Sequence, residues 1–387
     1  MGLGRVCRSH GLLRAAPVAV LAVLAMGAAL MLAAPVAAAP TVVVNTVPPQ
    51  VKGEPVYDSK LVAAPGQWEP AEVTYTYRWL RDGAPIAGAT ERTYRVMLDD
   101  LHHRIAVRVT ATDTVGGSGT ATSEDTDKVI RATLQVRRPP AVLGVTRFTH
   151  SVRATPGRWS ATPDRLHFQW LRDGNKISGA DGPRYRYVPA DVGTQVRVRV
   201  TAKAPGYDAA RTTSPSAGRV GHRVDVRRTV TYHVETRGRI TTSVAAFGRL
   251  AQQTYVDPRG WRGSGIRFRR VARGGSFTLV LAEASRVPGF SSSCSSEWSC
   301  RVGRYVIINQ ERWKHASPAW NAAHGSLRDY RHMVVNHETG HWLGLGHAGC
   351  PGPGRPAPVM MQQSKGLGGC HFNPWPTLHE QAGRTPH

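Results

Sequence analysis

Short runs in which apolar and polar residues alternate fill the chain between residues 40 and 221. Residues 73–77 read Val-Thr-Tyr-Thr-Tyr, and residues 196–200 read Val-Arg-Val-Arg-Val. This period of two is typical of a β-strand with one buried face. Asp82-Gly83 follows the first run, and this dipeptide favours a tight turn between antiparallel strands. The pattern therefore predicts antiparallel β-structure in this part of the chain.

An internal duplication relates the two halves of this region at an offset of 91 residues. Residues 77–83, Tyr-Arg-Trp-Leu-Arg-Asp-Gly, recur at 168–174 as Phe-Gln-Trp-Leu-Arg-Asp-Gly. The offset also relates, without a gap, Trp68 to Trp159, Ile86 to Ile177, Tyr94 to Tyr185 and Asp100 to Asp191. Such a shared register indicates two copies of one unit. We expect two β-sandwiches, at 40–131 and 132–221, which resemble the Ig-like repeats of bacterial surface proteins. Trp79 and Trp170 are expected in their cores.

From about residue 222 the pattern changes to a mixture of strands and helices. The expected strands are at 224–234, 266–268, 277–281 and 305–309, and the expected helices are at 241–255 and 328–343. The first helix is predicted from the spacing of Val244, Phe247, Leu250 and Tyr255 on one side. A mixed sheet with two or three helices predicts an α+β domain over 222–387.

One segment of this domain carries a metal-binding pattern. Residues 336–347 read Asn-His-Glu-Thr-Gly-His-Trp-Leu-Gly-Leu-Gly-His, which fits H-E-x-x-H-x-x-G-x-x-H without a deviation. On a helix, His337 and His341 stand one turn apart on the same face, so both imidazoles can reach one ion. Glu338 is then placed beside the metal, where it can take a proton from metal-bound water as a general base.

The second half of the pattern predicts a third ligand. Gly344 is expected to end the helix, because glycine readily takes the left-handed conformation that reverses the chain. This reversal brings His347 back towards His337 and His341. Three protein ligands leave a fourth position for water, which is typical of a catalytic rather than a structural zinc site. One catalytic Zn²⁺ is the expected cofactor, although other divalent ions can occupy such sites.

This segment resembles the metzincin zinc peptidases, which place a methionine turn beneath the zinc. The resemblance implies that Met360 forms this turn, with Met361 as the alternative. It departs from some metzincins at Gln362, where they carry a tyrosine ligand two residues after the methionine. Metzincins usually bind their substrate as an added strand along a sheet edge, and the strand 305–309 is the candidate edge here.

A longer likeness runs through Tyr330, the histidine segment, residues 356–360, Gly369-Cys370 and residues 373–376. Over about 222–376 the chain resembles a family of secreted actinobacterial proteins catalogued as a domain of unknown function. Together the two resemblances imply a multidomain chain: two all-β Ig-like sandwiches followed by a metzincin-like α+β zinc peptidase domain.

The first 39 residues have the pattern of an export signal. Arg5, Arg8 and Arg14 precede an apolar run at 15–34, and small residues at 36–38 suit a cleavage site after Ala38. The run is long, so an uncleaved anchor is the alternative. We expect the protein to be secreted or held at the surface of a bacterium.

The cysteine count supports an exported protein. Cys7 falls in the signal, which leaves Cys294, Cys300, Cys350 and Cys370. An even number of cysteines in an exported chain predicts disulfides with three pairings to choose from. We favour Cys294–Cys300 and Cys350–Cys370, because the members of each pair are close in sequence.

The formal charge of +24 arises from 50 Lys and Arg against 26 Asp and Glu, and only seven of the cations are Lys. This skew is typical of GC-rich coding, so the charge alone does not indicate a partner. A protein or peptide substrate is expected. Contact with a cell-wall polymer through the repeats or the basic surface remains open, and nucleic acid is not an expected partner.

Three functions compete on these observations. The first is a secreted endopeptidase that uses Glu338 and the metal. The second is a surface binding or adhesion protein with a non-catalytic metal site, which the intact Glu338 argues against. The third is a zinc amidase or esterase acting on cell-wall material, since zinc chemistry does not dictate the bond that is cleaved.

Overall fold

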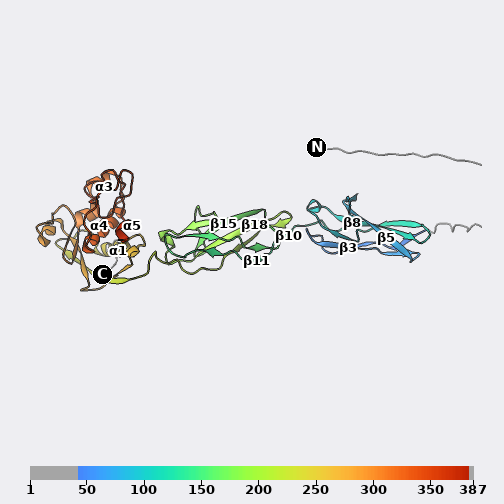
Figure 1. The fold of residues 1–387 in the computed structure, drawn as a ribbon, viewed down its shortest axis with the longest axis horizontal. Coiled ribbons are helices and arrows are strands. Elements are labelled where there is room, and N and C mark those ends of the chain that lie inside the picture. The colour runs from blue at the N-terminus through green and yellow to red at the C-terminus, as the bar shows by residue number, and fades with distance from the viewer. Residues whose placement is uncertain (1–41, 383–387) are drawn as a thin grey trace, which may run out of the picture.

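Two β-sandwiches and one unit of helices and strands follow one another along the chain (Figure 1). The structure is a computed structural model that describes residues 42–382, so the export signal expected at 1–39 lies outside the described residues. No helix within 42–382 is long and apolar enough to cross a membrane.

The first sandwich contains a four-stranded sheet in the order β6-β5-β8-β9, a three-stranded sheet in the order β2-β3-β7, and the pair β1-β4. The strands are β1 (Val44–Val47), β2 (Gln50–Lys52), β3 (Lys60–Ala64), β4 (Gln67–Glu69), β5 (Val73–Arg81), β6 (Ala84–Pro85), β7 (Thr93–Arg95), β8 (Ile105–Asp113) and β9 (Ser118–Thr122). A short 3-10 helix spans Leu98–Asp100. Asp82 and Gly83 have φ of 45° and 80° and form the predicted tight turn between β5 and β6.

The second sandwich repeats this topology. Its sheets have the orders β16-β15-β18-β20 and β12-β13-β17, with the pair β11-β14. The strands are β11 (Val136–Arg138), β12 (Val142–Leu143), β13 (Ser151–Ala154), β14 (Arg158–Trp159), β15 (Arg165–Arg172), β16 (Asn175–Lys176), β17 (Arg184–Arg186), β18 (Val196–Lys203) and β20 (Ala210–Thr213). A 3-10 helix spans Pro189–Asp191, and β10 (Ala132–Thr133) pairs with β19 (Tyr207–Asp208). The duplication in the sequence is therefore a duplication of the fold.

Each sandwich is built around a buried tryptophan. Trp79 and Trp170 are both fully buried, and each stacks on a tyrosine ring at a centroid distance of 5.4 and 5.3 Å. These tyrosines are Tyr94 and Tyr185, which the 91-residue offset relates. The sequence expectation that both tryptophans are core residues agrees with this packing.

The C-terminal unit is organised on a five-stranded sheet in the order β22-β21-β23-β25-β24. Only the β24–β25 pair is antiparallel. The strands are β21 (Arg228–Arg237), β22 (Ile266–Arg270), β23 (Phe277–Ala282), β24 (Cys300–Val302) and β25 (Tyr305–Asn309). The helices are α1 (Val244–Val256), α2 (Gln310–His315), α3 (Pro318–Ala322), α4 (Leu327–Trp342) and α5 (Leu378–Ala382), with 3-10 helices at Trp261–Ser264 and Ala284–Phe290. This is the α+β arrangement expected from the sequence.

The expected sheet edge was wrong. β25 lies between β23 and β24, so the strand at the edge is β24. β24 has only three residues, and its hydrophobic pattern is too short to identify a strand from sequence. The turn at Gly303, with φ of 52°, folds this short strand back along β25.

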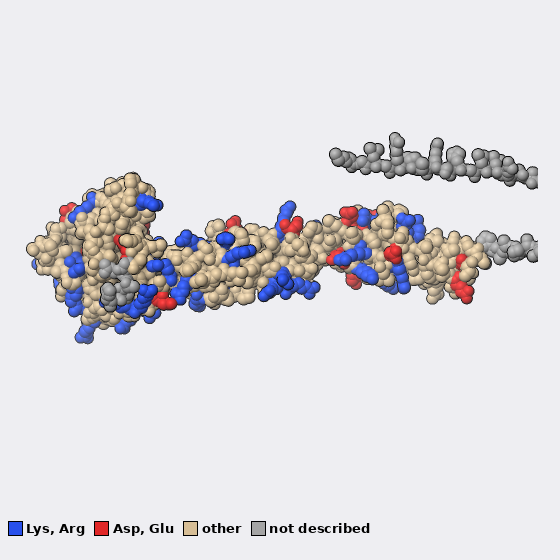
Figure 2. Space-filling model, viewed as in Figure 1, with Lys and Arg blue, Asp and Glu red and all other residues tan. Residues whose placement is uncertain are grey.

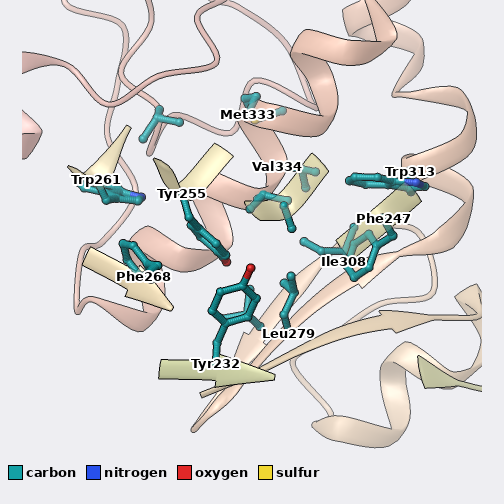
Figure 3. Close-up of a cluster of buried hydrophobic side chains, with 14 of the residues drawn as sticks. Tyr232, Phe247, Tyr255, Trp261, Phe268, Leu279, Ile308, Trp313, Met333 and Val334 are labelled. Atoms are coloured by element: carbon teal, nitrogen blue, oxygen red, sulfur yellow. The ribbon is translucent and has the colours of Figure 1, made fainter. Parts of the chain in front are cut away.

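The core of this unit lies between the sheet and the helices α1 and α4. Figure 3 shows Tyr232, Leu279 and Ile308 from the strands directed towards Tyr255, Phe247 and Val334 from the helices, with all six side chains buried. Ser243 caps the start of α1, because its side chain accepts a hydrogen bond from the Ala246 N–H at 3.2 Å. The packed side chains of the core fix α4 against the sheet.

Candidate metal centre

α4 places His337 and His341 on one face of a helix that is buried along most of its length. Ser326 caps its start by accepting a hydrogen bond from the Asp329 N–H at 3.0 Å. The two imidazoles are separated by one turn, as the spacing of four residues requires. Their ring centroids are 4.7 Å apart.

A Schellman motif ends α4 and returns the chain towards the two histidines. Gly344 has φ of 88° and its N–H donates to the His341 carbonyl at 3.0 Å, while the Leu345 N–H donates to the Gly340 carbonyl at 2.9 Å. These two bonds satisfy carbonyls that the end of the helix would otherwise leave free. The reversal brings His347 to the first two histidines.

The three imidazoles converge on one point through their Nε2 atoms. His341 Nε2 lies 3.1 Å from His337 Nε2 and 3.1 Å from His347 Nε2. The ligand atoms of all three residues lie within 4.8 Å of one another. Three nitrogens bound to a tetrahedral zinc at about 2.0–2.1 Å would be separated by roughly 3.3 Å. The spacing therefore fits a single zinc-sized ion.

Backbone carbonyls set the tautomers of the two helical histidines. His337 Nδ1 is 2.8 Å from the Val359 carbonyl, and His341 Nδ1 is 2.8 Å from the Leu345 carbonyl. Each Nδ1–H donates to its carbonyl, which leaves the lone pair on Nε2 for a metal. Burial, followed by the neighbouring His341, lowers the pKa of His337 to about 3. The histidines are thus held neutral, as metal ligation requires.

Glu338 is a buried carboxylate beside this triad. Its side chain is 5% exposed and makes no hydrogen bond with any residue in 42–382. Burial raises the pKa of Glu338 to about 8, and the Arg301 guanidinium partly opposes this shift. The carboxylate is therefore available to exchange a proton near neutral pH.

Met360 packs directly beneath α4, whereas Met361 does not. A Cβ atom added at Gly340 would lie 2.2 Å from Met360 Sδ and 2.9 Å from the Trp261 ring. Met360 is buried, and Met361 is partly exposed with its end near Gly368. Of the two candidate methionines, Met360 thus lies against the helix that carries His337 and His341.

Glu380 holds the loop that carries this methionine, and sequence reasoning missed it. Its buried carboxylate accepts hydrogen bonds from the Met360 N–H at 2.8 Å and the Val359 N–H at 3.1 Å. It also accepts from the Thr377 N–H at 2.7 Å, while Thr377 Oγ1 lies 3.3 Å from the Glu380 N–H. Thr-x-x-Glu is a capping-box signal, which predicts the start of α5 but not the bonds to the Met360 loop.

The cysteines pair as favoured from the sequence. Cys294 and Cys300 lie at disulfide distance, 2.02 Å between sulfurs, and Cys350 and Cys370 lie at 2.05 Å. The second pair closes a loop that includes Met360. The first pair joins β24 to the segment before it, next to the histidines.

A cleft of about 460 Å³ opens over the triad. Its walls come from the Cys294–Cys300 loop and β24, from α4, and from the segment after Met361. The lining residues include Trp298, Arg301, Tyr330, Glu338, Gln362 and Lys365, together with the three histidines. The Arg301 guanidinium donates to the His341 carbonyl at 2.7 Å, which fixes β24 to the end of α4. The cleft can thus hold a substrate against the triad and Glu338 together.

The comparisons with known proteins begin with a family match to the C-terminal part of the chain. Residues 204–377 match the profile of a family described as "Protein of unknown function (DUF3152)". The match begins directly after β18, within the second sandwich, and ends at Thr377 before Glu380.

A curated relative is the "Highly immunogenic outer capsid protein" of Enterobacteria phage T4, 30% identical over 153 residues. The match covers 36% of this chain and 39% of that protein, so the chain spans about two fifths of the relative's length.

Solved structures with Ig-like domains are more distant. Three N-terminal domains of the bacteriophage RB49 highly immunogenic outer capsid protein are 18% identical with a TM-score of 0.22, covering 49% of this chain and 66% of that one. The Ig1-2 module of the Drosophila receptor protein tyrosine phosphatase DLAR is 14% identical with a TM-score of 0.15, covering 45% and 97%. At these scores neither structure supports an inference about function. The chain thus has two β-sandwiches of one topology, and its residues 204–377 match the DUF3152 family model.

Proposed function

We propose that the C-terminal domain is a zinc-dependent endopeptidase of metzincin-like design. One observation carries this proposal: three histidine Nε2 atoms converge in the wall of a cleft, next to a buried carboxylate without a partner. A purely structural zinc site would need a fourth protein ligand and would have no use for Glu338.

The residues of the site suit the hydrolysis of a peptide bond. A zinc ion held by His337, His341 and His347 supplies Lewis acidity, which polarises a carbonyl group and makes water more acidic. Glu338 accepts a proton from the attacking water and delivers it to the leaving amine as general base and then general acid. Burial raises the pKa of Glu338 to about 8, near the range in which both proton transfers are efficient.

The substrate peptide is proposed to bind along β24. This strand has one partner, β25, so its other edge can add an extended peptide by backbone hydrogen bonds. β24 borders the cleft through Arg301 and lies next to the histidine triad. A peptide added there would cross the cleft in front of Glu338.

The direct test compares hydrolysis by the wild type and by Glu338→Gln, using a mixture of protein substrates and a cell-wall preparation. Glu311→Gln is the matched control, because Glu311 is a half-exposed residue of the same domain whose carboxylate pairs, among residues 42–382, with Lys314 and His315 alone. Zinc content is measured on all three proteins.

We expect Glu338→Gln to keep one zinc and to lose activity by about 10²–10⁴-fold, while Glu311→Gln remains active. If none of the three proteins cleaves any substrate although each holds zinc, the peptidase proposal is wrong. New carboxylates released from wall amides or esters, without cut proteins, would favour an amidase or esterase.

A binding role for the two Ig-like repeats is the second proposal. The T4 relative is named an outer capsid protein, and repeats of this kind would suit a protein displayed on a surface. The two disulfides fit an oxidising, extracellular location. In this proposal the repeats hold the catalytic domain at a bacterial surface, where a wall polymer is the expected partner. Binding of the purified protein to isolated cell walls, with and without residues 42–221, tests it.

A further inference from the structure

A second pocket in the C-terminal domain has four arginines among its nine lining residues. It has a volume of about 460 Å³ and lies between α1, β22, the 3-10 helix at Trp261–Ser264 and the segment that follows the second repeat. Its charged lining consists of Arg262, Arg267, Arg269 and Arg270, and it also contains His222, whose pKa is lowered to about 4 by burial and then by Arg262. It shares no lining residue with the histidine cleft.

No carboxylate among the described residues lines this pocket. The two acidic side chains that influence its members, Asp225 and Asp257, are already paired. Asp225 accepts two hydrogen bonds of 3.0 Å from Arg147 of the second repeat, and Asp257 accepts bonds of 2.9 and 2.8 Å from Arg259. The positive charge of the pocket is therefore not neutralised from within the structure. Figure 2 shows Lys and Arg in excess over acidic residues on the visible face of this domain.

Three of the four guanidinium groups have no partner. Arg267, Arg269 and Arg270 make no side-chain hydrogen bond or ion pair with any residue in 42–382. Arg262 is only 8% exposed, and it donates one hydrogen bond, to the Val224 carbonyl at 3.0 Å. Burial and then the charge of Arg267 lower the pKa of Arg262. A buried arginine that faces another cation indicates a position where a bound anion would be stabilised.

The backbone arranges these groups as a receptor rather than as a scattered surface. β22 is the strand at the other edge of the sheet, opposite β24. Arg267 and Arg269 lie two residues apart on this strand, so their side chains emerge on the same side about 6.6 Å apart. Arg262 approaches from the 3-10 helix. Guanidinium groups present paired donors that match the oxygens of phosphate.

The remaining lining adds an apolar part to the pocket. Val256 is its exposed apolar residue, whereas Tyr255 and Phe268 are buried in the core behind it. Gln252 and His222, whose buried Nδ1 has no hydrogen-bond partner, complete the lining. A volume of 460 Å³ exceeds what a single phosphate group fills. We propose that this pocket binds a phosphate ester, whose phosphate contacts Arg262, Arg267 and Arg269.

The proposal can be tested by calorimetric titration of the full chain after removal of metal, because phosphate could otherwise bind to the zinc centre. Inorganic pyrophosphate represents a small soluble phosphate, and a soluble glycerol phosphate oligomer represents a phosphodiester polymer. We expect saturable binding of at least one of the two with a stoichiometry of one per chain. Tighter binding of one ligand identifies the source of the phosphate, and either order agrees with the proposal.

Two variants with the same change of charge distinguish the pocket from general attraction to a basic protein. Arg267→Gln with Arg269→Gln removes two pocket arginines. Arg249→Gln with Arg273→Gln removes two exposed arginines of the same domain that do not line the pocket. The pocket variant should weaken binding by about tenfold or more, and the control by about twofold or less. Thermal unfolding of both variants shows whether they are folded, and Arg269→Gln alone replaces the pocket variant if it is not. The proposal is overturned if neither ligand binds saturably, or if the control variant weakens binding as much as the pocket variant.

Discussion

Two buried carboxylates show how differently the repeats and the C-terminal domain use charge. Asp191, in the second repeat, is fully buried and accepts hydrogen bonds from Arg172 Nε at 2.8 Å, the Tyr185 hydroxyl at 2.8 Å and the Val188 N–H at 2.7 Å. Glu338 is almost as buried and accepts no hydrogen bond within 42–382. A satisfied buried carboxylate stabilises the fold, whereas an unsatisfied one destabilises it and is retained for a function.

The first repeat supports this reading because it contains the same structural network. Asp100 accepts from Arg81 Nε at 2.7 Å, from the Tyr94 hydroxyl at 2.7 Å and from the Met97 N–H at 2.7 Å. The arrangement recurs at the 91-residue offset, residue for residue. It is part of how the sandwich is built. Glu338 has no such counterpart in either repeat.

The largest expected effect is on the stability of the second repeat. Asp191→Asn should lower its free energy of unfolding by about 3 kcal/mol, because it leaves the partly buried Arg172 next to a neutral amide and disturbs the buried bonds to Tyr185 and Val188. Urea unfolding of the full chain, followed by a probe in this repeat, measures the change. A loss below about 1 kcal/mol would mean that the network is not structural.

The next largest effect is a loss of stability of the C-terminal domain at acidic pH. Burial lowers the pKa of His332, on α4, from its usual 6.5 to about 4. The unfolded state therefore binds a proton more readily between these values, and stability is full above pH 6.5 and falls as the pH drops towards 4. The loss attributable to His332 is up to about 3 kcal/mol. Unfolding of the wild type and of His332→Gln across this range measures it, and equal pH dependence of the two proteins would contradict the prediction.

Replacing Glu338 by a neutral residue should raise the free energy of unfolding, whereas replacing Asp191 should lower it. The folded pKa of about 8 lies above the unfolded value, so the metal-free protein loses stability as the pH rises through this interval. At pH 7, Glu338→Gln should raise the free energy of unfolding of metal-free protein by about 1–3 kcal/mol. At pH 4 the two proteins should be equally stable. A destabilised Glu338→Gln at pH 7 would show that the carboxylate has a structural partner.

The smallest effect concerns Glu380, the other buried carboxylate of the C-terminal domain besides Glu338. Glu380→Ala removes the acceptor for the Met360 and Val359 N–H groups, and Val359 in turn holds His337 Nδ1. Zinc affinity should fall by about 10–100-fold. Competition with a chromophoric chelator measures the affinity. Thr377→Val is a useful control, because it removes the two bonds between the Thr377 hydroxyl and Glu380 and leaves the bonds from Glu380 to the Met360 loop in place.

The sequence predicted the parts of the site that are close together along the chain. The histidine spacing follows directly from helix geometry, and the repeats follow from a register of identical residues. Glu380 was not predictable in its role, because it reaches the Met360 loop only after the chain has folded back from Thr377. The strand β24 was missed because three residues carry no period, and β25 was taken as the edge in its place. The arginine pocket was hidden for the same reason, since residues 222 and 262–270 meet only through packing against α1.

The central claim is that Glu338 stands beside the metal and is free for chemistry. A crystal structure of the zinc-loaded protein, with data collected at the zinc absorption edge, tests it most directly. The account predicts one anomalous peak about 2.0–2.1 Å from the Nε2 atoms of His337, His341 and His347, with no bond from the Glu338 carboxylate. A zinc bound elsewhere, or a site closed by Glu338 as fourth ligand, would contradict it.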